Sequence, residues 1–134
     1  MESRTPIFTN KAPAPLGGLL SQGIVANGFV FTSGAIAQDP ATGKVVEGDI
    51  EEHTHQCIKN LGAILDAAGS SLNDVVEVTI YMGSSEKFAR MNQVYKTYWG
   101  DVKPARTTVF MSELPPETLV EMKCVGLVTK QDTS

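Results

Sequence analysis

Two charged residues, Arg106 and Glu121, lie inside segments that the sequence predicts to be β-strands. A charge in a partly buried strand needs a partner or a function. The guanidinium of Arg106 could bind a carboxylate with two parallel hydrogen bonds. Glu121 could position or deprotonate a water molecule. A cross-strand ion pair between the two residues, or two exposed strand positions, explains the same pattern, and both interpretations stand at this point.

The two histidines do not form a recognisable metal site. His53 and His55 are two positions apart on a predicted helix, so their side chains point roughly 200° apart. Glu51 lies one turn before His55, but no third ligand stands out, whereas structural zinc normally has four. We therefore expect both histidines to be solvated helix residues and expect no metal.

The two cysteines are expected to be core residues. Cys57 lies on the apolar stripe of a predicted helix, and Cys124 lies in the last predicted strand. No histidine is placed to activate either thiol, so the sequence does not support a Cys-His or Ser-His-Asp mechanism. Two cysteines do not make a disulfide framework, which favours a reducing compartment. We expect a cytoplasmic protein, with a processed mitochondrial form as the alternative.

The length and composition indicate one globular domain over residues 1–134, with a polar tail at about 130–134. Apolar residues make up 42% of the chain and charged residues 19%. The net charge of −4 argues against a generic nucleic-acid-binding protein, which usually carries a basic face. No apolar run reaches the roughly 18 residues of a membrane-spanning helix. Residues 1–11 lack the apolar segment of a secretory signal.

Hairpins are expected in the first half of the chain and alternating helices and strands in the second. Asn27 and Gly28 between two apolar runs predict a two-residue hairpin turn. Asp49 and Glu52 form a capping-box pattern that begins a helix ending at Ala68, before Gly69. The other expected elements are an edge strand within 6–10, strands over 24–26, 29–32, 75–82, 106–110 and 119–128, and a helix over 86–99 capped by Ser84 or Ser85.

This order predicts an α+β fold with a single mixed six-stranded sheet and two helices on one face. Such a sheet leaves its other face uncovered. A chain of this size with that geometry usually covers the open face by forming an oligomer.

Several segments together resemble the reactive intermediate deaminase family, also called the Rid, YjgF or L-PSP family. The resemblance extends in order from about residue 12 to residue 128. The Pro-Ala-Arg segment, followed at this separation by a strand glutamate, is its most specific part. The segments that carry it are Phe31–Gly34, Asp39–Gly43, Ala67–Gly69, Phe88–Tyr95, Lys103–Val109 and Val120–Met122.

The resemblance implies a fold similar to that of the small trimeric chorismate mutase, with a ligand cleft at each subunit interface of a homotrimer. It implies hydrolysis of enamines and imines, such as 2-aminoacrylate and 2-aminocrotonate, to 2-keto acids and ammonia. No metal or organic cofactor is implied, because a protonated imine carbon is already electrophilic. Arg106 would bind the substrate carboxylate, and Glu121 would polarise water or shuttle protons. The cleft would be lined by Ser33, Gly34, Asn92, Thr107 and Thr108.

Two positions depart from the family pattern. Members commonly have Gly-Pro-Tyr-Ser-Gln where this chain has Gly18-Leu19-Leu20-Ser21-Gln22, so Leu20 replaces a cleft tyrosine. The lost hydroxyl is worth roughly 1–3 kcal/mol if it bonded substrate or water. Thr108 stands where many members have cysteine, which is a milder change. Leu20 is therefore expected to weaken activity or direct it toward apolar side chains.

Three other functions remain to be compared with deamination. A non-catalytic trimer could bind small carboxylates through the same Arg106. An endoribonuclease or translation inhibitor is disfavoured, because the chain is acidic and has no histidine pair for RNA cleavage. A chaperone-like interaction protein is a further alternative, which the sequence does not test.

Overall fold

The computed structural model describes residues 3–130, which form a seven-stranded sheet and two α-helices. The strand order is β1-β2-β3-β7-β5-β6, and β4 follows β3 along the same edge of β7. Only β5 and β6 are parallel, so the sheet is mixed, as predicted. The elements are β1 Thr5–Ile7, β2 Gly23–Ala26, β3 Phe29–Thr32, β4 Ala35–Ile36, α1 Ile50–Ala67, β5 Val75–Met82, α2 Phe88–Tyr95, β6 Ala105–Phe110 and β7 Val120–Leu127. Of the predicted polar tail, residues 131–134 lie outside the described residues.

Local sequence signals account for the hairpin and for the first helix. Asn27 and Gly28 have φ angles of 53° and 82°, as the predicted turn requires. The side chains of Asp49 and Glu52 form the predicted capping box at the start of α1. Gly69, with φ of 83°, follows the end of the helix, and its carbonyl accepts hydrogen bonds from Thr129 and Lys130. These predictions are confirmed.

The seventh strand is the short β4, which the sequence did not indicate. Its two residues follow an irregular step in the β3–β7 ladder at Ser33 and Gly34. There the Thr32 hydroxyl accepts the Cys124 backbone N–H at 3.0 Å, which satisfies a donor that the interrupted ladder leaves free. Strand pairing therefore resumes at Ala35, whereas the sequence suggested that it ended at Gly34.

The second helix is shorter than predicted. A 3₁₀ turn over Ser85–Lys87 precedes α2, and neither Ser84 nor Ser85 makes a side-chain capping hydrogen bond. The chain leaves the helix after Tyr95 through bonds of the i to i−3 type. Trp99 then adopts φ of 83° and is 1% exposed. Burial of this indole, rather than helical periodicity, determines the path of residues 96–99.

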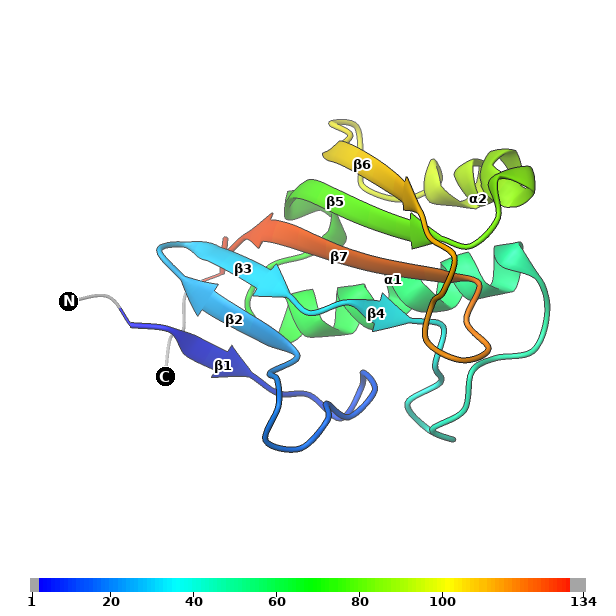
Figure 1. Ribbon diagram of the computed structural model, residues 1–134. Helices are drawn as coiled ribbons and strands as arrows, with labels where there is room; N and C mark the ends of the chain where they lie inside the picture. Colours follow the sequence, from blue (N-terminus) through cyan, green and yellow to red (C-terminus); the bar gives the residue numbers. More distant parts are fainter. Residues whose placement is uncertain (1–2, 131–134) are drawn as a thin grey trace.

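The two faces of the sheet differ in what covers them. In Figure 1, α1 lies behind the sheet and α2 lies at the right, next to β5 and β6, and the apolar core lies between the helices and the sheet. On this helix face the side chains of Val78, Ile80 and Met122 are fully buried, and Cys57 and Cys124 are buried free thiols, as predicted.

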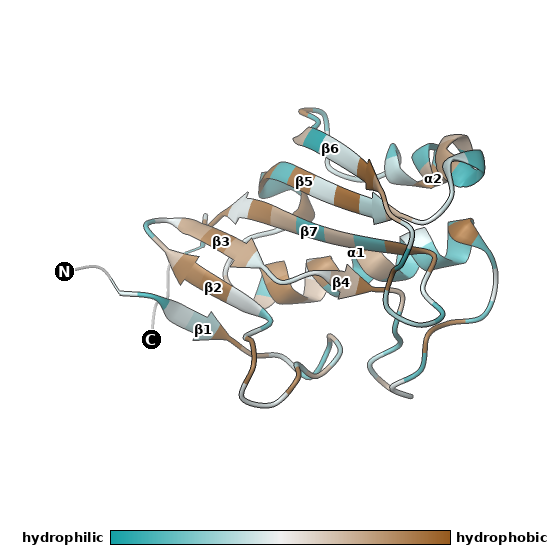
Figure 2. Cartoon of the chain, in the orientation of Figure 1, coloured by the Kyte–Doolittle hydropathy of each residue, from teal (hydrophilic) through white to brown (hydrophobic). Residues whose placement is uncertain are grey.

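The other face, called the open face below, has no helix over it. Phe31 and Leu127 on this face are 46% and 40% exposed. Figure 2 shows apolar bands alternating with polar ones along its strands. Within residues 3–130, no helix is long and apolar enough to cross a membrane.

Candidate functional site

Arg106 lies on the helix face near one edge of the sheet and contacts α2. Its Nη1 donates a hydrogen bond to Oδ1 of Asn92 at 2.7 Å. The guanidinium carbon lies 4.8 Å from the centroid of the Tyr95 ring and 5.4 Å from that of Phe88. These two rings and the Asn92 amide fix the plane of the guanidinium. We call Arg106, Asn92, Phe88 and Tyr95 the Arg106 cluster.

The Arg106 side chain keeps most of its hydrogen-bonding capacity for a ligand. It forms no ion pair with any carboxylate among residues 3–130, and a single side-chain bond uses one of its five N–H donors. Thr108 is on the same face of β6, and its buried hydroxyl has no partner in the described part of the chain. The buried Tyr95 hydroxyl is also without a partner, and burial raises its pKa to about 12, so the phenol is neutral. The cluster is therefore positive and can bind an anion.

Glu121 lies in a different place, on the open face of β7. It lines a cavity of about 630 Å³, called here the Glu121 cavity. Most of the lining is apolar and comes from the loop before β2, the β3–β4 step, α1 and the turn before β7. The lining residues are Pro13–Leu16, Leu20, Gln22, Ser33–Ile36, Gln38, Asn60, Ile64, Pro115, Pro116 and Glu121.

The carboxylate of Glu121 is packed against Gly34. A Cβ atom at position 34 would overlap the carboxylate as it lies here, so any other residue would require the end of the Glu121 side chain to shift. Within residues 3–130 the carboxylate takes part in no side-chain hydrogen bond and no ion pair. Burial raises the pKa of Glu121 above its ordinary value. Glu121 is therefore a carboxylate that exchanges protons nearer neutral pH than an exposed one does.

Buried polar side chains hold the walls of this cavity. The Ser33 hydroxyl donates to the Ser21 carbonyl at 2.6 Å, which ties the loop carrying Leu20 to the sheet. The Gln22 amide is 3% exposed and donates to the Pro13 carbonyl at 2.8 Å. The fully buried Asn60 amide donates to the carbonyls of Ile36 and Gln38 at 3.0 and 2.8 Å.

Gln22 and Asn60 were not among the residues predicted to line the site. The sequence signal for Asn60 was weak, namely one amide among the apolar positions of α1. Gln22 matches the last residue of the family segment at 18–22, but its role as an anchor was not predicted, because its partners are backbone carbonyls of a loop whose path the sequence does not reveal.

The eight predicted site residues do not gather in one place within a single chain. Leu20, Ser33, Gly34 and Glu121 line the Glu121 cavity. Arg106 and Asn92 are bonded in the Arg106 cluster, with Thr108 on the same face of β6. Thr107 is exposed on the opposite face of that strand. An Arg106–Glu121 ion pair, which the sequence left open, does not form within the chain.

The expectation for His53 was wrong. Its side chain is 3% exposed, and Nδ1 accepts the Leu119 backbone N–H at 3.1 Å. His55 is exposed and pairs through Nδ1 with the Tyr98 hydroxyl at 2.7 Å. The described residues contain no group of three His, Cys, Asp or Glu side chains that could hold a metal ion.

A family model, sequence relatives and solved structures all match this chain over most of its length. A model of the family described as "Endoribonuclease L-PSP" matches residues 9–128. A RutC family protein of Pyrococcus abyssi is 50% identical over 120 residues, which cover 90% of this chain and 94% of that protein. The 2-iminobutanoate/2-iminopropanoate deaminase of Rattus norvegicus is 36% identical over 124 residues, covering 92% and 90%. The crystal structure of YyfA from Yersinia pestis, of the conserved Rid family and of unknown function, has a TM-score of 0.90 at 38% identity and covers 94% of this chain and 100% of that one.

Proposed function

The chain belongs to the Endoribonuclease L-PSP family, which includes the Rid proteins, and from that membership we propose that it hydrolyses imines of 2-amino acids. The products are a 2-keto acid and ammonia. The named activity of the rat relative supports this reaction class. The observation that carries the proposal is that this chain has both an arginine fork free of any carboxylate partner among residues 3–130 and a carboxylate of raised pKa that lines a mostly apolar cavity.

Arg106 binds the carboxylate of the substrate in this proposal. The hydrogen bond to Asn92 and the rings of Phe88 and Tyr95 hold the guanidinium in one orientation before the ligand arrives. Because less side-chain freedom is lost on binding, a bidentate contact with a carboxylate is favoured. The substrate is thereby oriented with its imine carbon directed away from the arginine.

Glu121 performs the proton transfers. Its carboxylate takes a proton from water while the water oxygen bonds to the carbon of the protonated imine, and the product is a neutral carbinolamine. Glu121 then returns the proton to the amine nitrogen. The C–N bond breaks as the Glu121 carboxylate takes the proton of the hydroxyl, so the carbonyl forms and ammonia leaves. The raised pKa of Glu121 suits a group that must both accept and donate a proton near neutral pH.

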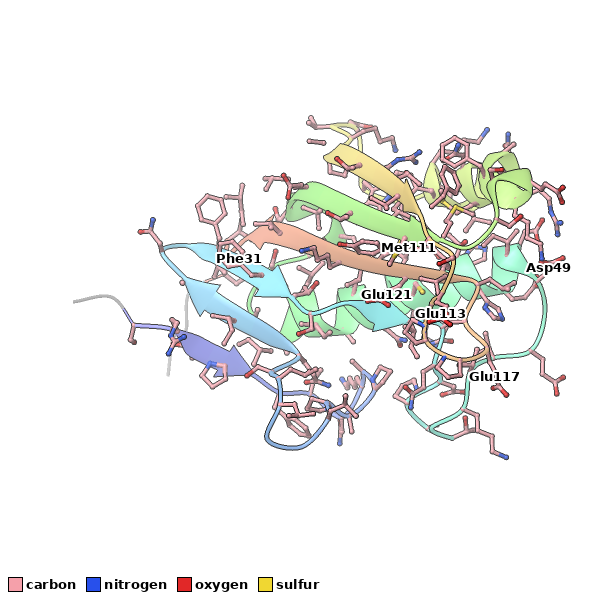
Figure 3. All side chains as sticks on the ribbon, in the orientation of Figure 1. Phe31, Asp49, Met111, Glu113, Glu117 and Glu121 are labelled. Atoms are coloured by element: carbon pink, nitrogen blue, oxygen red, sulfur yellow. The ribbon has the colours of Figure 1, made fainter. Side chains whose placement is uncertain are left out.

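A site that uses both residues requires two copies of the chain, because Arg106 and Glu121 lie on opposite faces of one sheet. We propose that a homotrimer forms through the open face and the adjoining edge strand β6, which brings Arg106 of one subunit to the Glu121 cavity of the next. Phe31 and Glu121 both lie on this face in Figure 3. The exposed apolar side chains there are suited to burial between subunits.

A second candidate is binding of small carboxylates without chemistry. Leu20 favours it, because this residue provides no hydroxyl to the Glu121 cavity. RNA cleavage is not proposed, since the chain carries a net charge of −4.

A coupled assay tests the deaminase proposal. A threonine dehydratase generates 2-aminocrotonate, and the formation of 2-ketobutyrate is followed with and without the protein. We expect acceleration by the wild type that Arg106→Ala and Glu121→Gln both lose. Arg90→Ala and Glu113→Gln are matched controls, because Arg90 is paired with Asp49 and Glu51 on the surface and Glu113 is exposed. No acceleration by a folded trimer that still binds 2-ketobutyrate would favour the second candidate.

A further inference from the structure

The peptide just before Glu121 is held by side chains from other parts of the chain. The Thr118 hydroxyl accepts the Ala37 backbone N–H at 3.1 Å and donates to the Val120 carbonyl at 2.8 Å. The Leu119 N–H donates to Nδ1 of His53 at 3.1 Å. Thr118 is 6% exposed and His53 is 3% exposed, so the two Thr118 bonds are buried and the His53 bond is partly buried. The entry to β7 is therefore fixed by tertiary contacts.

His53 makes the contact that strand pairing cannot make. The β5–β7 ladder ends at the pair Met82 and Val120, so the Leu119 N–H has no acceptor in the sheet. A partly buried N–H without an acceptor is costly. Because Nδ1 accepts this bond, the proton of the neutral imidazole lies on Nε2. His53, in the tautomer with its proton on Nε2, thus orients the backbone N–H of Leu119, two positions before Glu121.

The backbone that carries Glu121 has little freedom to move. The Glu121 carboxylate lies directly against Gly34, so a shift of this backbone changes where the carboxylate sits in the cavity. Val120, between Leu119 and Glu121, is fully buried and cannot absorb a rotation of the peptide. We propose that His53 is a positioning residue, which places the Glu121 carboxylate by accepting the Leu119 N–H. This inference rests on the proposed deaminase function.

Two substitutions at position 53 distinguish the effect of the hydrogen bond to the Leu119 N–H from the effect of packing. His53→Asn places a carbonyl oxygen close to the position of Nδ1, whereas His53→Leu fills the space without an acceptor. Displacement of a reacting group by about 1 Å costs up to about a hundredfold in rate, so we expect His53→Leu to lower kcat by at least about tenfold. KM should stay within about twofold of the wild type, because Arg106 is untouched. His53→Asn should recover most of kcat, and His55→Leu, on the exposed side of the same helix, should leave it unchanged.

Thr118 provides a second pair in case His53→Leu does not fold, which urea unfolding would show. Thr118→Val removes the hydroxyl and should lower kcat, whereas Thr118→Ser retains the hydroxyl and should not. A folded His53→Leu with the kcat of the wild type would overturn the proposal. The proposal would also fail if His53→Asn had a kcat as low as that of His53→Leu. If His53→Leu does not fold, a wild-type kcat in Thr118→Val would overturn the proposal instead.

A measurement without substrate distinguishes failure of this inference from failure of the proposed function. The side-chain carboxyl of Glu121 is titrated by carbon-13 NMR in the wild type, His53→Asn and His53→Leu. We expect the titration midpoint to move in His53→Leu and to stay in His53→Asn. An unchanged midpoint in a folded His53→Leu would overturn the inference whether or not the wild type hydrolyses imines.

Discussion

Arg106 and Glu121 project from opposite faces of the same sheet, in different rows of paired residues. Arg106 is level with Val78 and Cys124, whose side chains are buried beneath the helices. Glu121 is level with Tyr81 and Val109, across the open face. No rotation of the two side chains can bring them to one small ligand, so a shared function requires contact between chains.

Mixing two inactive variants tests this requirement. Arg106→Ala keeps Glu121, and Glu121→Gln keeps Arg106. If one site takes each residue from a different subunit, random mixed trimers should recover about a quarter of the wild-type activity, since each residue is intact with a probability of about one half. Unfolded and co-refolded mixtures are assayed against each variant refolded alone. Activity no greater than that of the separate variants would contradict a shared site.

Gly34 should influence the rate of the reaction because of the space that it leaves for the Glu121 carboxylate. Gly34→Ala would force the Glu121 carboxylate to move. We expect kcat to fall by up to about a hundredfold, which is the loss that a misplaced catalytic group can cause. Gly17→Ala is the matched control, because a Cβ at Gly17 meets no atom within 4 Å. Circular dichroism confirms that both variants are folded. Equal kcat values for Gly34→Ala and the wild type would show that the packing against Glu121 is unimportant.

Leu20 should influence which imines react. It lines the Glu121 cavity with the other apolar side chains, so we expect larger apolar substrates to be favoured. Leu20→Tyr adds a hydroxyl and should raise kcat/KM for 2-iminobutanoate by about tenfold relative to a branched six-carbon imine. Leu19→Tyr is the control, because Leu19 is 77% exposed and does not line the cavity. If the ratio of kcat/KM for the two imines were the same in the wild type, Leu20→Tyr and Leu19→Tyr, Leu20 would not determine specificity.

Asp49 should make the fold sensitive to strong acid. The hydrogen bond from Lys87 and those from the Ile50 backbone and Arg90 lower its pKa from 3.8 to about 2. A carboxylate with a lower pKa in the folded state stabilises the fold above the unfolded pKa, and this contribution is lost as pH falls from about 4 through about 2.

Urea unfolding at several pH values checks this prediction. Asp49→Asn retains a side chain that caps helices well, and it should lose less stability than the wild type over that pH interval. Asp101→Asn, at an exposed aspartate, should follow the wild type. A wild type and an Asp49→Asn variant with parallel pH profiles would contradict a stabilising role for this charge.

Short-range features of the fold could be predicted from the residues alone. The Asn27-Gly28 turn, the Asp49 capping box and the Gly69 helix end depend on local backbone preferences, and all three are present. The strand over 75–82 was also predictable, because β-branched residues dominate it. Glu121 was recognisable because it interrupts an apolar strand pattern, and Arg106 because it is a charge at the start of a strand predicted to be partly buried.

The tertiary structure decided the features that depend on partners distant in sequence. The two residues of β4 form a strand only because β7 offers an edge to pair with. His53 is buried because the Leu119 peptide meets it, and nothing near His53 in sequence indicates that contact.

The sequence predicts the face of the sheet for Glu121 but not for Arg106. In β7, Val120 and Met122 flank Glu121, and this alternation assigns the glutamate to the open face by sequence alone. In β6, apolar and polar residues do not alternate, so the sequence is compatible with either face for Arg106. Pairing with β5 settles it by placing Arg106 level with the buried Val78. The residue types and their chemistry were therefore determined by the sequence, and their separation onto two faces by the register between strands.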